Sequence, residues 1–479
     1  MPEQITQVPV HARPPLEEKT RMTYLEFLDH QPMTKFLWLL LCGVLLAEIL
    51  DGMDFQMTAF AMPGIIRGFH INAAQAGAIS SAGNIGLMVG ATLFSLLCDR
   101  IGRKPIFQWV LFCFALGSLL SAVAPTYNAL LAARFVAGLG IGSELPIGAA
   151  ILAEYAPLRR RHIFIALVPL VWSIGWIVAA VLSIYMVPVW GWRSLFWAGV
   201  IPAVMIIGVR WFLPESVRFL LSKGKTEEAG KIVEELARKT GRTNLELVPP
   251  LPVKGQVKLS FVQQLAMLRS LWAPMVVLAL VYFCFFIQTW GINAWLPTIF
   301  VRQGFTLAKS FTYTLIILCV TPLSHLIAMW LQERINRKWA MLLLTTVGTV
   351  LFVMFGLSFQ YKWPIQAIVT VQLLQTLAVQ GVITILYTLS AELFPTPVRS
   401  LGIGFVQSLG RFGAVLGPFA LGLFLTFGTD ISHVIYFFAA PLLVAAILAV
   451  IVIRFDPRKH TLEQITTEVE AEVGMAAGH

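Results

Sequence analysis

The sequence predicts an all-α membrane protein in which twelve transmembrane helices form two six-helix pseudo-repeats. The prediction depends on the composition, the spacing of apolar runs and motifs that occur twice. The chain has 479 residues, of which 57% are hydrophobic and 13% are charged. Soluble domains contain about 45–50% apolar and about 25% charged residues. The composition therefore excludes a soluble globular protein and leaves no room for a sizeable soluble domain.

The predicted spans follow one another along the chain as apolar runs with short polar connections. A membrane helix needs about 20 predominantly apolar residues, and tilt accommodates differences in length. We expect spans at residues 36–62, 74–98, 105–124, 127–153, 163–188, 194–209, 271–298, 310–331, 339–359, 363–391, 400–427 and 431–453. The first six form an N-terminal half, residues 36–209, and the last six form a C-terminal half, residues 271–453.

Three segments lie outside the two halves. Residues 1–35 form an N-terminal tail, in which Tyr24 and Phe27 predict a short interfacial helix. This tail has no short apolar core followed by a cleavage site, so we expect no signal peptide. Residues 210–270 form a linker with one or two amphipathic helices, and residues 454–479 form a C-terminal tail.

The basic residues set the predicted orientation. When the lysines and arginines outside the spans are assigned alternately to the two sides, one side collects 28 and the other 5. Cytoplasmic loops carry the excess of positive charge, so the tails and the linker are predicted to be cytoplasmic. We expect a multi-pass protein of the plasma (inner) membrane with both termini inside.

Composition and motifs limit the partners. The formal net charge is +10, but cations in the loops of an apolar chain set orientation and do not indicate nucleic acid. We expect no metal and no organic cofactor, because the five cysteines form no C-x-x-C pair and the sequence has no H-E-x-x-H and no phosphate-binding loop. A membrane enzyme is the least favoured class.

Two loop motifs occur in both halves. Residues 97–104 align with residues 331–338 at an offset of 234, and residues 153–161 align with residues 391–399 at an offset of 238. Both pairs follow the second or the fourth span of their half. This is the pattern of a parallel duplication.

The first of these motifs carries a family resemblance that covers nearly the whole chain. Asp99-Arg100-x-Gly102-Arg103-Lys104 resembles the signature of the major facilitator superfamily. The Glu-x6-Arg spacings in both halves and Pro214-Glu215-Ser216-Val217-Arg218 are similar to the sugar-porter and synaptic-vesicle-glycoprotein-like branches. Asp51-Gly52-Met53-Asp54 resembles the aromatic-acid:proton symporters, and Leu28-Asp29-x-x-Pro32 is similar to metabolite and niacin transporters. The resemblance implies the major facilitator fold and secondary transport.

Charged residues inside the predicted spans are the first candidates for function, because a charge at the bilayer centre costs about 3 kcal/mol or more. Six are present: Glu48, Asp51, Asp54, Arg134, Glu144 and Arg411. We predict a proton-coupling set of Asp51, Asp54, Glu144 and Arg134. The arginine belongs to this set because Arg134-x3-Gly138-x-Gly140-x-Gly142 resembles the span 4 motif of the superfamily. Alternatively, an acid only neutralises Arg134 or caps a helix broken at Gly52.

Arg411 indicates the sign of the substrate. A guanidinium in mid-span requires a carboxylate, from a ligand or from the protein itself, for which Asp54 is the alternative candidate. Aromatic and amide side chains of neighbouring spans complete the predicted substrate site, although such aromatic residues also occur at lipid interfaces or in the core. The predicted substrate-binding residues are Arg411, Gln288, Trp290, Asn293, Trp172, Trp176, Gln375 and Tyr387.

Acid and base pairs in the loops predict conformational latches between the halves, by resemblance to facilitator relatives. The alternative is that these loops only set orientation. The predicted latch residues are Asp99, Arg100, Arg103, Lys104, Glu154, Arg161, Glu333, Arg334, Arg337, Glu392 and Arg399.

The sequence thus predicts a monomeric, proton-coupled symporter that imports a small organic anion by alternating access. An aromatic or heterocyclic carboxylate is the expected substrate. A sugar, polyol or organic-cation facilitator of the same fold is the alternative within the class. A membrane receptor or sensor that binds ligand without flux is the alternative outside it.

Overall fold

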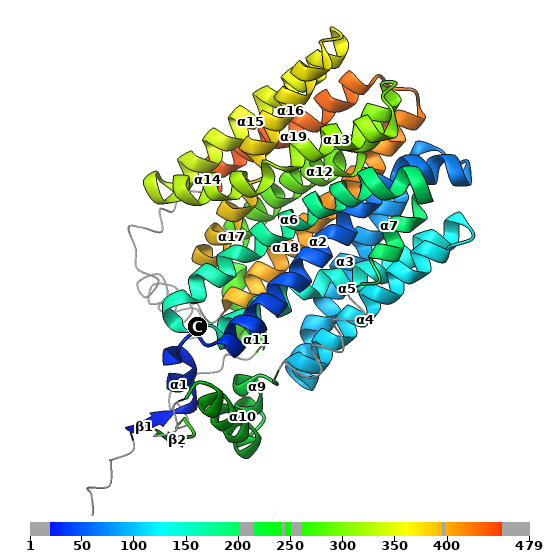
Figure 1. The fold of residues 1–479 in the computed structure, drawn as a ribbon. Coiled ribbons are helices and arrows are strands. Elements are labelled where there is room, and N and C mark those ends of the chain that lie inside the picture. Colours follow the sequence, from blue (N-terminus) through cyan, green and yellow to red (C-terminus); the bar gives the residue numbers. More distant parts are fainter. Residues whose placement is uncertain (1–19, 202–213, 242–244, 251–260, 395–397, 453–479) are drawn as a thin grey trace, which may run out of the picture.

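The fold is a bundle of long helices with a small unit at one end (Figure 1). The computed structural model describes residues 20–201, 214–241, 245–250, 261–394 and 398–452. The N-terminal half contains α2 (Lys35–Phe69), α3 (Ala73–Ile101), α4 (Arg103–Val123), α5 (Tyr127–Tyr155), α6 (Leu158–Trp190) and α7 (Arg193–Ala198).

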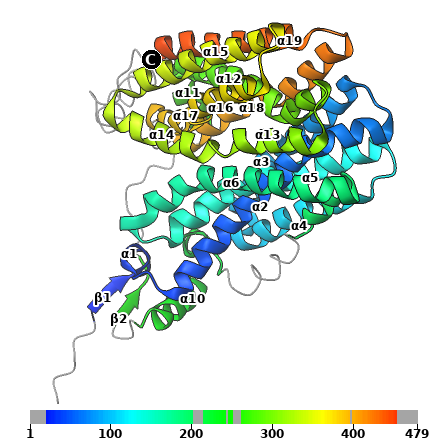
Figure 2. The ribbon, with the colours of Figure 1, turned by 45° about the horizontal axis from the view of Figure 1, so that its top comes forward.

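The C-terminal half repeats this order of long helices. It contains α11 (Phe261–Ser270), α12 (Trp272–Arg302), α13 (Leu307–Leu318), α14 (Thr321–Arg334), α15 (Arg337–Gln360), α16 (Ile365–Val379), α17 (Val382–Leu393), α18 (Arg399–Thr426) and α19 (Ile431–Val452). Figure 2 shows the two halves as separate layers, with α2 to α6 in one and α12 to α19 in the other.

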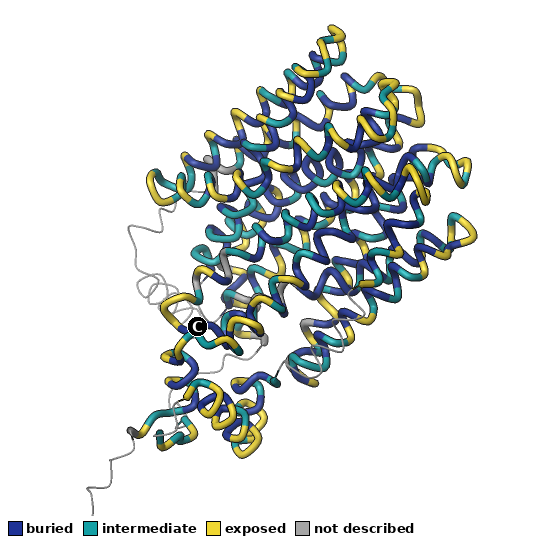
Figure 3. Tube along the Cα trace, viewed as in Figure 1, coloured by how far each residue is buried: buried dark blue, intermediate teal, exposed yellow. Residues whose placement is uncertain are grey.

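Within the described residues, ten candidate membrane spans meet the length and hydropathy expected for a bilayer crossing. They correspond to ten of the twelve predicted spans. The fourth predicted span is the 29-residue helix α5, and the sixth begins at α7 and continues into residues 202–213, outside the described part. Large apolar side chains such as Leu96 and Trp109 are exposed, as a lipid-facing surface requires. Figure 3 shows exposed positions along the outer helices and at both ends of the bundle.

Glycines allow helices of the N-terminal half to approach closely. A Cβ atom on Gly52 of α2 would overlap the backbone carbonyl of Trp172 on α6, and a Cβ on Gly175 would overlap the carbonyl of Ile49. The hydrophobic effect does not drive helices together within lipid. Small residues at such crossings stabilise the contact by letting the helices pack closely. The crossing brings the polar centre of α2 against α6.

Two spans of the C-terminal half are broken near their midpoints. The α13–α14 span breaks at Cys319 and Val320, and the α16–α17 span breaks at Gln380 and Gly381. The breaks pack on each other, because the Gly381 N–H donates to Ser324 Oγ at 2.6 Å. Broken helices in transporters are tolerated where freed backbone groups find such partners.

A small unit of helices and strands lies at one end of the bundle. It contains β1 (Thr20–Thr23), α1 (Tyr24–His30), α9 (Val217–Ser222), α10 (Thr226–Lys239) and β2 (Leu245–Val248). We call the end that carries this unit the basic end, because the basic loops at Gly102, Pro157 and Asn336 also lie there.

The strands of this unit are a feature that the predicted all-α class lacks. β1 and β2 pair in parallel, with Thr20 opposite Leu245. The pairing joins the N-terminal tail to the linker. Phe27 and Leu28 of α1, where the pattern predicts an interfacial helix, are buried in a core that includes Val233 of α10. Strands of four residues leave a weak periodic signal, so the sequence pattern did not indicate them.

The two halves are joined at α3 and α18. Ser81 Oγ donates to the Val415 carbonyl at 2.5 Å, and Asn84 Nδ2 donates to the Ala414 carbonyl at 2.7 Å. Farther towards the end opposite the basic end, the Ala74 N–H donates to Thr426 Oγ1 at 2.8 Å. These bonds hold the halves together from mid-bundle to the opposite end.

Candidate functional site

A buried ion pair lies at the centre of the N-terminal half. Arg134 Nη2 on α5 donates to Asp54 Oδ2 on α2 at 2.6 Å, and both side chains are almost fully buried. Ser118 Oγ donates to the other carboxyl oxygen at 2.6 Å. Gly199 leaves room for the carboxylate, because a Cβ there would lie 2.7 Å from Asp54 Oδ1. Asp54 therefore neutralises Arg134 in this state, as the structural alternative predicts.

The other predicted acids have no cation beside them among the described residues. Asp51 of α2 and Glu144 of α5 are buried, and their carboxyl oxygens have no hydrogen-bond donor. The two carboxyls lie close enough to share a hydrogen bond if one of them carries a proton. The arrangement brings together all four residues of the predicted proton-coupling set, Asp51, Asp54, Glu144 and Arg134.

A cavity of about 100 Å³ lies between the two halves. One water needs about 10–15 Å³ by the same measure, so the cavity has room for several waters or a small solute. Its lining comes from both halves and is mainly apolar and aromatic. The lining includes five predicted substrate residues, namely Trp172, Trp176, Trp290, Tyr387 and Arg411.

The aromatic side chains of the cavity form a contiguous cluster. The ring of Trp172 lies 5.2 Å from that of Trp176 and 6.0 Å from that of Trp290, between centroids. Phe55 completes the cluster, 4.4 Å from Trp290. These rings contact each other across the two halves, so they can cover the faces of a flat ligand.

Arg411 on α18 is the cation of this cavity. Among the described residues, no carboxylate lies within ion-pair distance of its guanidinium, and Asp54 is held by Arg134. The hydroxyl groups of Tyr282 and Tyr387 are titratable groups that lie near enough to interact with the guanidinium. Its side chain is half-buried, and a guanidinium within the membrane is costly without an anion, so an anionic ligand would be favoured here.

The predicted amides lie in a different place. Gln288, Asn293 and Gln375 line a polar void of about 10 Å³ within the C-terminal half, not the aromatic cavity. Thr289 and Gln380 border both spaces. The sequence placed all eight substrate residues in one site, and the structure divides them into an aromatic, cationic cavity and an adjoining amide-lined void.

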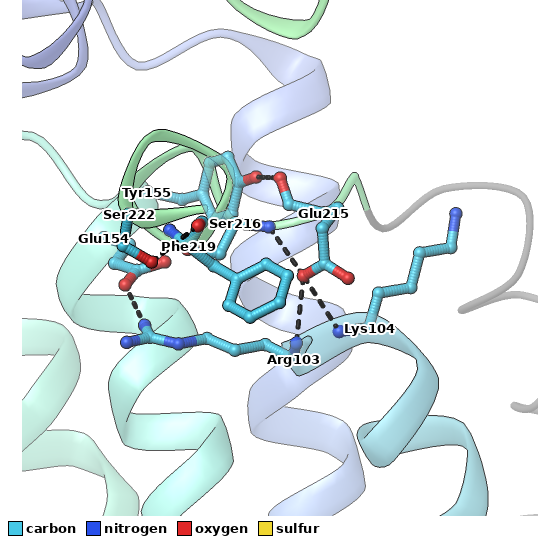
Figure 4. Close-up of polar contacts among 8 residues, drawn as sticks. All are labelled: Arg103, Lys104, Glu154, Tyr155, Glu215, Ser216, Phe219 and Ser222. Atoms are coloured by element: carbon cyan, nitrogen blue, oxygen red, sulfur yellow. Dashed lines mark hydrogen bonds and ion pairs between the residues drawn. The ribbon is translucent and has the colours of Figure 1, made fainter. Parts of the chain in front are cut away.

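The latch residues of the N-terminal half form a network that includes the linker (Figure 4). Arg103 pairs with Glu154, within the same half. Glu215 Oε1 accepts the backbone N–H groups of Arg103 at 2.9 Å and Lys104 at 3.2 Å. Arg161 pairs with Asp29 of α1 and not with Glu154.

The C-terminal half contains an equivalent pair, Arg337 with Glu392. Arg399 Nε donates to the Phe394 carbonyl at 3.1 Å. Arg100, Glu333 and Arg334 are exposed at the basic end, and the side chain of Asp99 lies outside the described part. The latch pairs Arg103–Glu154 and Arg337–Glu392 each lie within one half in this state.

Two residues that the predicted site omits are Asn84 and Glu215. Asn84 lines the cavity and bonds across the halves. Pro418 is the sequence feature that could have indicated this contact. A proline within a helix gives no N–H to the carbonyl four residues earlier, here that of Ala414, so another donor is needed. Glu215 belongs to the family motif at residues 214–218, but its capping contact spans 112 residues, which no local pattern indicates.

Comparison with known proteins identifies the family of this chain. Residues 31–469 match the family described as Sugar (and other) transporter. The chain belongs to this family. It is thus a membrane transporter and not an enzyme, and it has the fold of the major facilitator superfamily.

The transporter has relatives over nearly its whole length. It is 30% identical over 449 residues to the niacin transporter NiaP of Acinetobacter baylyi, covering 93% of this chain and 100% of the relative. It is 27% identical to the 4-hydroxybenzoate transporter PcaK of Pseudomonas aeruginosa, covering 91% and 97%. A crystal structure of a D-xylose-proton symporter matches with a TM-score of 0.70 at 15% identity, covering 89% and 100%. At that identity the likeness shows the fold alone.

Proposed function

We propose that this transporter is a proton-coupled symporter that imports a small aromatic or heterocyclic carboxylate. The observation that carries the proposal is Arg411, a half-buried cation without a carboxylate partner among the described residues, in a cavity lined by Trp172, Trp290 and Tyr387. A guanidinium binds a carboxylate through two parallel hydrogen bonds. Aromatic rings cover the apolar faces of the same ligand.

The names of the relatives support this substrate class. Niacin and 4-hydroxybenzoate, which name two of them, are both carboxylates on a six-membered aromatic ring. Relatives named for benzoate and gallate transport have the same chemistry. A sugar or polyol has no anion for Arg411, so the unpaired guanidinium favours the acid.

Protonation of the buried acids would couple transport to the proton gradient. Asp51 and Glu144 lie against each other, and two such carboxyls in an apolar bundle hold a shared proton more readily than two charges. Asp54 would be a second site of protonation, where the carboxylate releases Arg134 as it takes up a proton. The coupling would require the acids to load on one side and unload on the other.

Alternating access would supply the two sides. We propose that the basic end faces the cytoplasm, following the excess of basic residues in its loops. The hydrogen bonds between α3 and α18 would keep the opposite end closed in this state. The latch residues would join the halves at the basic end in the alternate state, and the monomer would suffice as the transport unit.

Uptake into proteoliposomes tests the proposal. Labelled nicotinate, benzoate, 4-hydroxybenzoate and xylose would be offered with a pH gradient and a membrane potential imposed separately. A potential of 100 mV is worth about 2.3 kcal/mol per charge moved. An acid anion carried with one proton is expected to follow the pH gradient and ignore the potential. Accumulation of xylose, or of no acid, would contradict the proposal.

Variants of Arg411 test the anion site. Arg411→Ala is expected to abolish acid uptake, and Arg411→Lys is expected to restore part of it as a point charge. Arg302→Ala is the matched control, because Arg302 is an exposed arginine at the end of α12. Normal acid uptake by Arg411→Ala would overturn the anchoring role.

A further inference from the structure

Glu48 is a buried acid outside the predicted proton-coupling set. It lies on α2, one helical turn before Asp51 in the direction of the basic end, and its side chain has no exposed surface. Among the described residues, neither carboxyl oxygen has a hydrogen-bond partner, and no lysine or arginine lies within 4 Å. A carboxyl in such surroundings is costly to keep unless it has a function.

The bundle makes room for this carboxyl. A Cβ atom on Gly148 of α5 would lie 2.5 Å from Glu48 Oε1 and 3.3 Å from Val44 Cγ1. The glycine therefore leaves a notch on α5 that the carboxyl fills. Glu144 lies one turn before Gly148 on the same face of α5, because residues four apart are neighbours on a helix.

Other ionisable groups face Glu48 from two sides. Within the N-terminal half these are Asp51 on its own helix and Glu144 on α5, with Asp54 a turn beyond Asp51. From the C-terminal half, Tyr387 on α17 lies close enough to sense the Glu48 charge. Tyr387 lines the cavity and also senses Arg411. Glu48 thus lies near both the acid pair and Tyr387, a residue of the cavity wall.

We propose that Glu48 is a proton carrier that passes the proton from the Asp51–Glu144 pair towards the basic end. The proposal rests on the proposed symport. The O–H bond of the protonated pair breaks as a Glu48 oxygen takes the proton, and the pair is left as a carboxylate. Glu48 then gives the proton to water and returns to its charged form. The residues Asp54, Asp51 and Glu48, spaced by three, form a line of acids along one face of α2.

The test separates proton release from substrate movement. Labelled benzoate uptake would be measured in proteoliposomes under a one-unit pH gradient, which supports about tenfold accumulation when one proton accompanies each anion. Exchange of labelled for unlabelled benzoate at equal pH would be measured in parallel. Exchange moves loaded carrier both ways and needs no net proton release.

Glu48→Gln is expected to retain exchange and to lose the accumulation, while Glu48→Asp is expected to recover part of the accumulation. Glu235→Gln, which removes an exposed carboxylate of α10, is the control and is expected to behave as the parent. Full accumulation by Glu48→Gln would overturn the carrier role and leave symport intact. Loss of both exchange and accumulation in Glu48→Gln would also overturn it. Absence of driven uptake in the parent protein would overturn both proposals.

Discussion

Asn84 on α3 donates a hydrogen bond of 2.7 Å to the carbonyl oxygen of Ala414 on α18, across the boundary between the two halves. Ala414 lies four residues before Pro418, and proline has no N–H to give to that carbonyl. Asn84 supplies the donor that the proline removes. One side chain therefore satisfies a buried backbone oxygen and joins the halves.

A double-mutant cycle tests this relationship. Asn84→Ala is expected to lower the free energy of unfolding by about 1–3 kcal/mol, because the Ala414 carbonyl loses its partner. With Pro418→Ala in place, α18 regains the N–H for that carbonyl, and the cost of Asn84→Ala should fall below about 0.5 kcal/mol. Denaturant unfolding in detergent gives the four free energies. Equal costs in both backgrounds would show that the carbonyl is not the partner that matters.

The helices and the polar centre of the bundle follow from sequence because their signals are local. Each span is an apolar run of membrane length, and Asp51 and Asp54 are three residues apart on one face of a helix. Arg134 could be assigned to the proton set by its motif. Its pairing with Asp54 stayed one of two alternatives, because 80 residues separate Arg134 from Asp54 and Arg411 was another candidate partner for this acid.

Longer-range relationships escaped the sequence for a physical reason. The void that holds Gln288 and Gln375 is separate from the aromatic cavity because α12 presents different faces to the two spaces and α16 lines only the void. Helix rotation of this kind is set by packing. The strand pair of β1 and β2 joins residues 225 positions apart. Neither feature has a local pattern.

The crossing of α2 and α6 gives a second prediction. Gly52→Ala is expected to lower the free energy of unfolding by about 3 kcal/mol or to prevent insertion, because its Cβ would overlap the Trp172 carbonyl. Gly43→Ala on the same helix is the matched control, since nothing lies within 4 Å of its Cβ. It should be neutral or stabilising by up to about 1 kcal/mol. Equal behaviour in thermal unfolding and surface expression would contradict the close crossing.

The Asp54–Arg134 pair gives a third prediction, on stability. Asp54→Leu alone is expected to cost about 3–5 kcal/mol, because it leaves a buried guanidinium without an anion. Asp54→Leu with Arg134→Met should cost much less, since both charges are removed. Unfolding free energies of the two singles and the double decide the matter. If the costs of the two single variants add up to that of the double variant, the two charges do not stabilise each other. Asp54→Leu and the double variant should both lose proton-driven uptake.

Asp430, before α19, gives a prediction on pH. The Ser432 N–H donates to Asp430 Oδ1 at 2.8 Å, and this bond holds the pKa of the Asp430 carboxyl below its usual value of 3.8. The capped form is therefore favoured above that value and is lost as the pH falls through the lower pKa of the folded state. Amide exchange at the start of α19 should accelerate below about pH 4, relative to Asp430→Asn, which caps without titrating. Identical profiles would contradict the titrating cap.

The Glu215 carboxylate caps a helix from 112 residues away. α4 begins after Gly102, whose φ of +118° favours glycine and which has no side chain to cap the helix. Glu215 Oε1 instead accepts from Arg103 N and Lys104 N, and Tyr155 Oη holds the Glu215 carbonyl at 2.8 Å. The start of the linker is therefore fastened to the loop between α3 and α4.

Glu215→Ala is expected to cost about 1–2 kcal/mol of unfolding free energy, the usual range for a lost cap. Glu215→Gln keeps one acceptor oxygen and should lose only about 0.5 kcal/mol, the part that comes from the charge at a helix N-terminus. Glu227→Ala, which removes an exposed acid in the first turn of α10, is the control. If Glu215→Gln lowered the free energy of unfolding as much as Glu215→Ala, the charge alone would matter. If both matched the control, the linker would not cap α4 in the membrane.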